Sequence, residues 1–344
     1  MNALFGYTGF VGNHILKYKH FDFLYRSTNI NEALNKEYDE VYFTSLPGTK
    51  WVANKTPEID FEIMSQCINI LSTIKCKKFV LISTIDVYEN INSCDNEDYE
   101  NSPSKLHKYG EHRLLFEKFV KKTFDNNFIF RIPALFGDGL KKNVLFDLIN
   151  NNEVYKVNLN STFQWYNLAW LNEHFEICFT NNIRLCNLFS EPLYTNEIAK
   201  LFDYNYIDNY EHNLINYNLH TKHWKHFGKC DNYICSKEKC LESIIQFIKQ
   251  FKKDNIKCLP DKCDVVIHKK DTSIVGNIDP KPLDNIIYQK SNHLFYPLFD
   301  KYKRIIFFNT NNQIIVNNVK NEKEFSLNTP NYYYWMVNSD ITAH

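Results

Sequence analysis

Glycine is scarce in this chain of 344 residues, which holds only nine of them. That is less than half of the usual share of about 7%. Asparagine is abundant and can occupy the left-handed turn positions that glycine usually takes. We therefore expect the few glycines to lie where no side chain fits. Three of them, Gly6, Gly9 and Gly12, stand close together near the N-terminus.

Neither sign of charge is in excess, because 40 basic side chains balance 40 acidic ones. Proteins that bind nucleic acid through its phosphates carry a basic excess or a clustered basic face. The basic runs here are only pairs, at Lys77-Lys78, Lys141-Lys142 and Lys269-Lys270. The sequence therefore argues against nucleic acid as a partner.

Long apolar runs are also missing, since no uninterrupted stretch approaches the roughly 18 residues that a membrane helix needs. The ten cysteines have irregular spacings and no signal peptide precedes the first motif, which favours reduced thiols over a disulfide scaffold. His220, His223 and His226 are followed by cysteines without a CxxC pair, a spacing that matches no standard zinc site. We expect a cytoplasmic protein with no membrane partner and no metal site.

Apolar residues are plentiful, at 44% of the chain with 16% aromatic, so the chain can bury a large core. The apolar segments near the N-terminus alternate between strand and helix patterns. Helices are predicted at 13–18, 59–74 and 109–121, and strands at Asn2–Phe5, Phe21–Tyr25, Val41–Ser45, Phe79–Ser83 and Phe128–Ile132. This alternation predicts a doubly wound α/β domain with a parallel sheet.

The first predicted strand ends in the turn Gly6-Tyr7-Thr8-Gly9-Phe10-Val11-Gly12 and leads into a helix. A turn at such a junction aims free backbone N–H groups and the positive end of the helix at one point, which suits a pyrophosphate. Gly9 permits close approach of the backbone, and Gly12 permits packing of helix against strand. An ordinary tight turn is the alternative. We predict a dinucleotide site with contacts from Gly6, Thr8, Gly9, Phe10, Val11 and Gly12.

The end of the second predicted strand bears on which dinucleotide binds. An acidic residue about 20 positions after the first glycine usually binds the ribose hydroxyls of NAD. Here Arg26, Ser27 and Thr28 occupy that place. A cation with two hydroxyls suits a 2′-phosphate, so we expect NADP. NAD is the alternative, because Asp22 lies only a few residues earlier.

Hydroxyl groups end the fourth predicted strand at Ser83 and Thr84, and Tyr109 begins a predicted helix with Arg113 four positions later. Taken singly, a tyrosine on an amphipathic helix is usually a packing residue and a Ser-Thr pair is usually a cap. In register with the glycine turn, these residues resemble the extended short-chain dehydrogenases/reductases, the superfamily of nucleotide-sugar epimerases, dehydratases and reductases. The similarity covers roughly residues 1–255 and includes Arg131-Ile-Pro-Ala-Leu-Phe-Gly137-Asp-Gly139.

The resemblance implies a Rossmann-type sheet with a smaller substrate subdomain, and it implies roles for single residues. Tyr109 would donate or accept a proton at the sugar carbon that is reduced or oxidised, and Thr84 would hydrogen-bond the same oxygen. The family has a lysine where this chain has Arg113. A cation there lowers the pKa of Tyr109 and contacts the nicotinamide ribose, but arginine is planar and bulkier than lysine.

The implied activity is that of an NAD(P)-dependent oxidoreductase or epimerase that acts on a nucleotide-activated sugar, with a homodimer as one candidate assembly. Epimerisation and net reduction use the same tyrosine and hydroxyl, so the motifs do not separate them. A catalytically silent dinucleotide-binding protein is the alternative that Arg113 leaves open. His112, beside Arg113, is interpreted as a packing or surface residue.

Three residues are candidate substrate contacts. Lys50 follows the third predicted strand, where cofactor and substrate both pass in such folds. Asn143 lies where the substrate contacts of the family usually begin, and Gln164 lies in the aromatic segment Phe163-Gln164-Trp165-Tyr166. A surface loop is the alternative for Lys50, and aromatic core packing is the alternative for the segment around Gln164.

Residues 1–257 form the predicted reductase-like domain, which an amphipathic helix at 236–252 closes. Residues 258–344 are predicted to be a small β-rich appendage of unknown role. Its strands are expected at Val265–His268, Ile286–Gln289, Arg304–Phe308, Gln313–Asn317 and Tyr332–Val337, with a hairpin turn at 309–312. The appendage would extend a dimer interface, cover the active site or bind a partner.

Overall fold

The structure is a computed structural model of the chain. It describes residues 1–202, 214–228 and 230–256 and, beyond these, six strands, β11 to β16. The chain divides into two compact units, Met1–Ile248 and Lys249–His344. Every candidate site residue lies in the first unit. Helix α8 (Lys237–Ile256) crosses the boundary between the units, close to the domain end predicted at residue 257.

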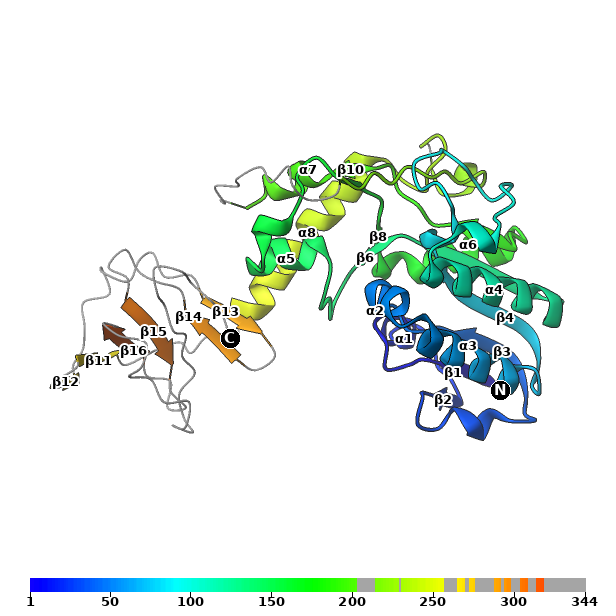
Figure 1. The fold of residues 1–344 in the computed structure, drawn as a ribbon, viewed down its shortest axis with the longest axis horizontal. Helices are drawn as coiled ribbons and strands as arrows, with labels where there is room; N and C mark the ends of the chain where they lie inside the picture. The colour runs from blue at the N-terminus through cyan, green and yellow to red at the C-terminus, as the bar shows by residue number, and fades with distance from the viewer. Residues whose placement is uncertain are drawn as a thin grey trace. The chain divides into compact units, whose positions relative to one another are not determined.

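A six-stranded parallel sheet forms the centre of the first unit, in the order β2-β1-β3-β4-β5-β9 (Figure 1). Its strands are β1 (Asn2–Phe5), β2 (Phe23–Tyr25), β3 (Glu37–Phe43), β4 (Lys75–Thr84), β5 (Asn127–Ile132) and β9 (Leu185–Asn187). Ala3 of β1 pairs with Phe23 on one side and with Val41 on the other. The connections after β1 and β3 therefore diverge, which is the switch point where ligands bind in doubly wound sheets.

Helices cover both faces of this sheet. They are α1 (Phe10–Leu16), α2 (Lys50–Lys55), α3 (Pro57–Leu71), α4 (Lys108–Thr123) and α6 (Leu171–Thr180). Successive side chains of a strand point to opposite faces. Phe43 accordingly stacks on Phe116 of α4, whereas Tyr42 contacts Phe175 of α6. Helices α3 and α4 lie side by side on the first of these faces (Figure 1).

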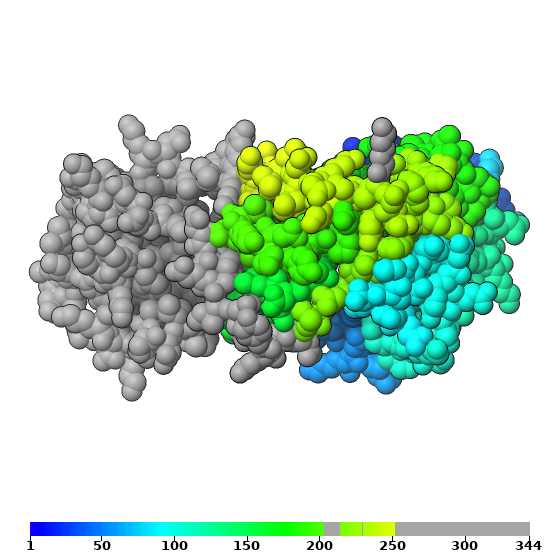
Figure 2. Space-filling view, turned by 90° about the horizontal axis from the view of Figure 1, so that it is seen from above, coloured from blue at the N-terminus to red at the C-terminus, as the bar shows by residue number. Residues whose placement is uncertain are grey.

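The segments after β5 build a smaller part of the same unit. Its elements are β6 (Ala134–Phe136), α5 (Val144–Asn150), β7 (Thr162–Phe163), β8 (Trp165–Asn167), β10 (Leu193–Tyr194) and α7 (Thr195–Ala199). Backbone hydrogen bonds from Cys94 to Asn218 and from His220 to Asp95 join it to the loop after β4. Figure 2 shows these cyan and yellow-green segments side by side at the surface.

Short 3-10 turns connect several of these elements. They are η1 (Ile30–Ala33), η2 (Ile85–Val87), η3 (Pro103–Lys105), η4 (Val154–Lys156), η5 (Leu168–Trp170) and η6 (Trp224–His226). The turn η2 matters most for the site, because it follows directly on Thr84 at the end of β4. It places Asp86 at the same sheet edge as Thr84.

In the second unit, the described strands are β11 (Val265–Lys269), β12 (Thr272–Val275), β13 (Tyr288–Ser291), β14 (Leu294–Pro297), β15 (Arg304–Phe308) and β16 (Ile314–Asn318). Four of them form a sheet in the order β12-β11-β16-β15, and β13 pairs with β14. The β-rich composition predicted for this region agrees with these strands. The strand predicted at 332–337 and the hairpin turn predicted at 309–312 lie outside the described residues.

The predicted α/β fold class is confirmed, and the differences concern single elements. Strand β1 has the predicted bounds, and β5 and α4 each begin one residue before the prediction. Helix α1 begins at Phe10, three residues earlier than predicted, because Gly12 inside it has a poor helix propensity that masks the first turn. Strand β9 was not predicted, since three residues give no usable periodicity.

One buried ion pair ties β4, β5 and α4 together. Arg131 of β5 donates from Nε and Nη2 to the two carboxylate oxygens of Glu117 on α4, at 3.0 and 2.7 Å. The Ser83 hydroxyl donates to the same carboxylate at 2.5 Å, and Arg131 also donates to the Tyr88 hydroxyl. Burial alone would raise the pKa of Glu117, but the Arg131 guanidinium outweighs it and holds that pKa below its usual range. The charge of each partner is therefore compensated.

Replacement of Glu117 by Gln is expected to destabilise the fold by about 3–5 kcal/mol, because it leaves the Arg131 charge buried without a partner. Chemical denaturation at neutral pH measures this loss. Since the folded-state pKa of Glu117 lies below the unfolded value, its stabilisation is present at neutral pH and is lost as the pH falls through the folded-state pKa. The control is Glu37→Gln, which breaks the exposed pair with Lys75 and should leave the midpoint unchanged.

Candidate active site

The glycine turn after β1 is packed so closely that side chains have no room. Gly6 has a φ of +87°, a conformation that favours glycine, and its amide donates to the Tyr25 carbonyl at 2.8 Å. A Cβ on Gly12 would lie 2.2 Å from the Gly6 carbonyl oxygen. A Cβ on Gly6 would lie 2.6 Å from the Thr44 hydroxyl, which donates to the Phe5 and Gly6 carbonyls from the end of β3. The turn is therefore fixed at the switch point between β1 and β3.

No side chain caps the N-terminus of α1, whose N-cap residue is Gly9. The first amides of a helix have no partner within the helix, so those that follow Gly9 are left to a ligand or to water. The turn thus offers bare backbone and unpaired donors at one point, which fits a pyrophosphate. The predicted cofactor residues Gly6, Thr8, Gly9, Phe10, Val11 and Gly12 all belong to this turn or to the first residues of α1.

Arg26 directly follows β2 on the same sheet edge and is exposed. Its Nε donates to the Thr28 hydroxyl at 2.9 Å, and its backbone amide donates to the Asn29 side chain at 2.8 Å. The Asp22 carboxylate instead accepts the Asn2 amide at 2.6 Å, at the start of β1. Asp22 therefore lies at the opposite end of the strands from the glycine turn, where it does not reach a ribose bound there.

Thr84 and Tyr109 are brought together by the approach of α4 to the turn η2. A Cβ on Gly110 would lie 2.1 Å from the Asp86 carbonyl oxygen, so only glycine permits this approach. The Tyr109 amide is held by the Asn54 side chain of α2 at 2.9 Å. As a result the Tyr109 phenol lies beside Thr84, whose hydroxyl donates to the Asp86 carboxylate at 3.3 Å, and both side chains are largely buried.

Arg113 lies on the same side of α4 as Tyr109 but is engaged elsewhere. Its guanidinium makes two hydrogen bonds to the Asp60 carboxylate of α3, at 2.9 and 2.8 Å, and a third to the Pro47 carbonyl at 2.6 Å. His112 Nδ1 lies 2.7 Å from the same carboxylate. Contact between Arg113 and a nicotinamide ribose, which the motif implied, would require this buried pair to open. The pair therefore argues against the predicted cofactor contact of Arg113.

The charge of Arg113 still acts on Tyr109, because the guanidinium carbon lies 4.5 Å from the centre of the phenol ring. Burial is the largest influence on the pKa of Tyr109 and raises it, and the carboxylates of Asp86 and Asp60 raise it further. Arg113 and the Thr84 hydroxyl lower the pKa, but the net shift is upward. Tyr109 is therefore a protonated phenol at neutral pH.

A second group of polar side chains surrounds Asp86, just beyond Thr84. Lys50 Nζ donates to the Asp86 carboxylate at 2.6 Å, the Tyr217 hydroxyl donates to it at 3.1 Å, and His107 Nε2 lies 3.7 Å away. Burial alone would raise the pKa of Asp86, but His107 and Lys50 outweigh it and lower that pKa to about 2. Lys50 thus comes from α2 and lies beside Asp86, and its contact with a substrate stays a prediction. Its partner is a carboxylate of the chain.

Asn143 and Gln164 support the scaffold. The Asn143 side chain caps α5 by accepting the Phe146 amide and donates to the Leu135 carbonyl. Gln164 is 1% exposed, and its amide donates to two backbone carbonyls and accepts the Leu219 amide. Because a substrate could reach Gln164 only if these bonds broke, we remove it from the candidate substrate contacts. The side chain of Asn143 is likewise engaged in hydrogen bonds within the chain.

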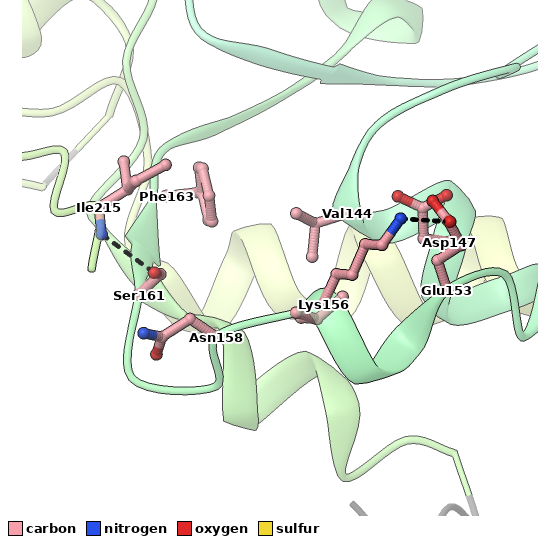
Figure 3. Close-up of a pocket in the computed structure, with 9 residues that line it drawn as sticks. Val144, Asp147, Glu153, Lys156, Asn158, Ser161, Phe163 and Ile215 are labelled. Carbon is pink, nitrogen blue, oxygen red and sulfur yellow. Dashed lines mark hydrogen bonds and ion pairs between the residues drawn. The ribbon is translucent and has the colours of Figure 1, made fainter. Parts of the chain in front are cut away.

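The immediate neighbours of these two residues line a cavity of about 200 Å³ in the smaller part of the unit (Figure 3). Its lining consists of Val144, Asp147, Glu153, Lys156, Val157, Asn158, Ser161, Phe163 and Ile215. Phe163 also stacks on Tyr217, with ring centres 5.9 Å apart, and the Tyr217 hydroxyl donates to Asp86. One aromatic pair therefore connects this cavity with the Asp86 cluster beside Tyr109.

No protein-family model matches the chain, and no curated protein matches its sequence. Solved structures match its fold. UDP-N-acetylglucosamine 4-epimerase from Methanobrevibacter ruminantium M1 aligns with a TM-score of 0.52 at 12% identity, over 74% of this chain and 98% of its own. A dTDP-4-dehydrorhamnose reductase from Clostridium acetobutylicum ATCC 824 aligns with a TM-score of 0.50 at 17% identity, over 73% and 100%. TunA, an NAD-dependent NDP-hexosamine 5,6-dehydratase of tunicamycin biosynthesis, aligns with a TM-score of 0.54 at 12% identity, over 73% and 97%.

The chain shares the Rossmann-type α/β fold of these nucleotide-sugar enzymes. The resemblance that its motifs predicted is thereby confirmed for the fold. At such low identity the alignment carries no residue roles, so the assignment of roles rests on the geometry around Tyr109.

The short-chain dehydrogenase/reductase motifs did not point to Asp60, Asp86, His107 or Tyr217. Asp86 had a signal in the sequence, since it stands two residues after Thr84 at the end of an apolar strand. Asp60 and Tyr217 had none, because they come from a helix and a loop far away along the chain. Among the described residues, no helix is long and apolar enough to cross a bilayer. No three His, Cys, Asp or Glu side chains in that part of the chain converge as a metal site requires.

Replacement of Gly110 by Ala is expected to destabilise the fold by about 1–3 kcal/mol, because the new methyl group overlaps the Asp86 carbonyl. This loss would occur although alanine is a better helix former than glycine by about 1 kcal/mol. Thermal unfolding measures it. The matched control is Gly48→Ala, where nothing lies within 4 Å of the added Cβ. Equal stability of the two variants would contradict the close approach of α4 to η2.

Proposed function

We propose that this protein is an NAD(P)-dependent oxidoreductase or epimerase that acts on a nucleotide-activated sugar. One observation carries the proposal: the Tyr109 phenol lies beside the Thr84 hydroxyl at the carboxyl end of β4, at the same sheet edge as the glycine turn after β1. A phenol and a hydroxyl placed together can both hydrogen-bond one carbonyl or alcohol oxygen of a substrate. Tyr109 would then move the proton, and Thr84 would hold the oxygen in place.

The glycine turn would hold the pyrophosphate of the cofactor through the backbone amides that follow Gly9. The bound nicotinamide would supply the hydride chemistry. Arg26, Ser27 and Thr28 follow β2 at the same edge, and the Arg26 side chain is exposed there. A guanidinium and two hydroxyls favour NADP over NAD, because they complement a 2′-phosphate.

The cavity in the smaller part of the unit is the proposed substrate site. Phe163 of the cavity stacks on Tyr217, and the Tyr217 hydroxyl donates to Asp86, so the cavity is connected with the Asp86 cluster. Its lining mixes an aromatic ring with amide, hydroxyl and charged groups, which suits a polar ligand such as a nucleotide. We propose that the nucleotide occupies this cavity while the sugar extends toward Tyr109.

Replacement of Tyr109 by Phe is expected to lower turnover of a sugar nucleotide at least about 100-fold, because the proton donor is lost. Nicotinamide absorbance follows the turnover, and fluorescence titration should show unchanged dinucleotide binding. The matched control is Tyr99→Phe, which removes a hydroxyl 3.4 Å from Glu89 at the surface and should leave turnover intact. Tight dinucleotide binding by the unmodified protein without turnover of any sugar nucleotide would instead favour a catalytically silent binding protein.

Replacement of Arg26 by Ala is expected to weaken NADPH binding about 10-fold to 100-fold, because a charge-assisted contact to the 2′-phosphate is lost. NADH binding should change little, since NADH has no such phosphate. Calorimetric titration with both cofactors measures the ratio of the two affinities. Arg184→Ala, at the amino end of β9, serves as the control for loss of one positive charge. Unchanged NADPH binding in Arg26→Ala would contradict the preference for NADP.

A further inference from the structure

The position of the Arg113 guanidinium sets this site apart from one in which a free cation stands beside the catalytic phenol. Both oxygens of the Asp60 carboxylate face the guanidinium, and the Pro47 carbonyl accepts a further hydrogen from it. Arg113 is 5% exposed and Asp60 is 4% exposed. Two opposite charges held in this geometry act on their surroundings as a dipole, and much of the guanidinium charge is cancelled.

The remaining field of Arg113 acts on the face of the Tyr109 ring. The guanidinium carbon lies 4.5 Å from the ring centre, and none of the hydrogen bonds of Arg113 described above goes to the phenol oxygen. The other group that lowers the pKa of Tyr109 is the neutral Thr84 hydroxyl, and this hydroxyl donates to the Asp86 carboxylate at 3.3 Å. The stabilisation that a phenolate would need is therefore largely missing.

The other charged and titratable groups around Tyr109 come from every neighbouring element. Asp86 follows β4 and bears a negative charge, although Lys50 of α2 is paired with it. The His107 ring is stacked 6.3 Å from the Tyr109 ring, and Tyr217 hydrogen-bonds Asp86. The groups that face Tyr109 directly or through a partner are Asp60, His112, Arg113, Asp86, Lys50, His107 and Tyr217. Two carboxylates in this set oppose ionisation of the phenol, and each cation is bound to one of them.

We propose that Asp60 is a positioning residue that closes Arg113 into an ion pair and thereby keeps Tyr109 protonated, so that the site donates a proton to a keto sugar. This proposal rests on the proposed function and adds the direction of the reaction, which is reduction of a ketone. A protonated phenol suits reduction of a ketone, whereas oxidation of an alcohol needs a phenolate that accepts the proton. The substrate class is therefore a nucleotide-activated keto sugar, and the reaction that supplies it must generate that ketone.

The atoms balance as a reduction. The Tyr109 O–H bond breaks and an O–H bond forms at the substrate oxygen, while the carbonyl carbon accepts a hydride equivalent from the reduced dinucleotide. The ketone is reduced to an alcohol, and the dinucleotide is oxidised. Tyr109 is left as a phenolate and recovers its proton from water, so each turnover consumes one proton from the solvent.

The test is a titration of Tyr109 in the full chain with tyrosine labelled with carbon-13 at Cζ. The Tyr109 signal is assigned by its absence in Tyr109→Phe. In the unmodified protein this signal should stay at its phenol position to at least about pH 10, the ordinary pKa of tyrosine. Ionisation of Tyr109 below about pH 9 would overturn the proposal, and Tyr109→Phe serves only to assign the signal.

The role of Asp60 is tested with Asp60→Asn, which leaves the charge of Arg113 without its partner. Tyr109 should then ionise at a pH lower by one unit or more, and Asp60→Glu should restore the original titration. A variant that removes the surface carboxylate of Asp39, which pairs with Lys77, is the control and should change nothing. An unshifted Tyr109 titration in a folded Asp60→Asn protein would overturn the role of Asp60.

The direction of the reaction is tested with a keto sugar nucleotide and with the alcohol that its reduction gives. Both are chosen because the turnover assay detects activity with them. At pH 7, the unmodified protein should reduce the ketone faster than it oxidises the alcohol, and Asp60→Asn should shift this ratio toward oxidation. Faster oxidation by the unmodified protein would overturn the direction. Absence of turnover on every sugar nucleotide would refute the proposed function, and the titration alone would still decide whether Asp60 controls Tyr109.

Discussion

The contact between the first turn of α4 and the turn η2 is the constraint on which the rest of the site depends. Gly110 lies against the Asp86 carbonyl with no room for a Cβ, and this approach sets the distance from Tyr109 to Thr84. It also brings His107, the N-cap residue of α4, near the Asp86 carboxylate. A wider separation would leave a phenol on one element and a hydroxyl on another, too far apart to bind one oxygen together.

Charge compensation is the second organising feature of this site. Each buried carboxylate near Tyr109 has a cation of its own: Asp60 has Arg113, and Asp86 has Lys50. Burial of a lone charge would cost several kcal/mol, so the fold needs these pairs whatever the chemistry. The same pairing leaves the Tyr109 phenol neutral, which relates the stability of the fold to the proposed direction of proton transfer.

The scarcity of glycine helped to locate the site because glycine stands where backbones meet. An added Cβ would lie less than 3 Å from a neighbouring atom at Gly6, Gly12 and Gly110, so these glycines cannot be replaced without a shift of the structure. Gly48 has no such neighbour and lies in the loop after β3. Contact with a neighbouring backbone distinguishes Gly6, Gly12 and Gly110 from Gly48. The sequence alone did not distinguish a packed glycine from a solvent-facing one.

Local patterns in the sequence were enough to predict the alternation of strands and helices, the glycine turn and the register of Thr84 and Tyr109. They were enough because strand and helix periodicities and a strand-to-helix turn are properties of neighbouring residues. The partners of these residues were not predictable in this way. Asp60 meets Arg113, and Tyr217 meets Asp86, across long separations along the chain, and only the packing of α3 and the distant loop against α4 and η2 brings them together. The sequence therefore determined which residues are the candidates for the chemistry, and the tertiary structure decided which charges they face, because the electrostatic environment depends on distance in space.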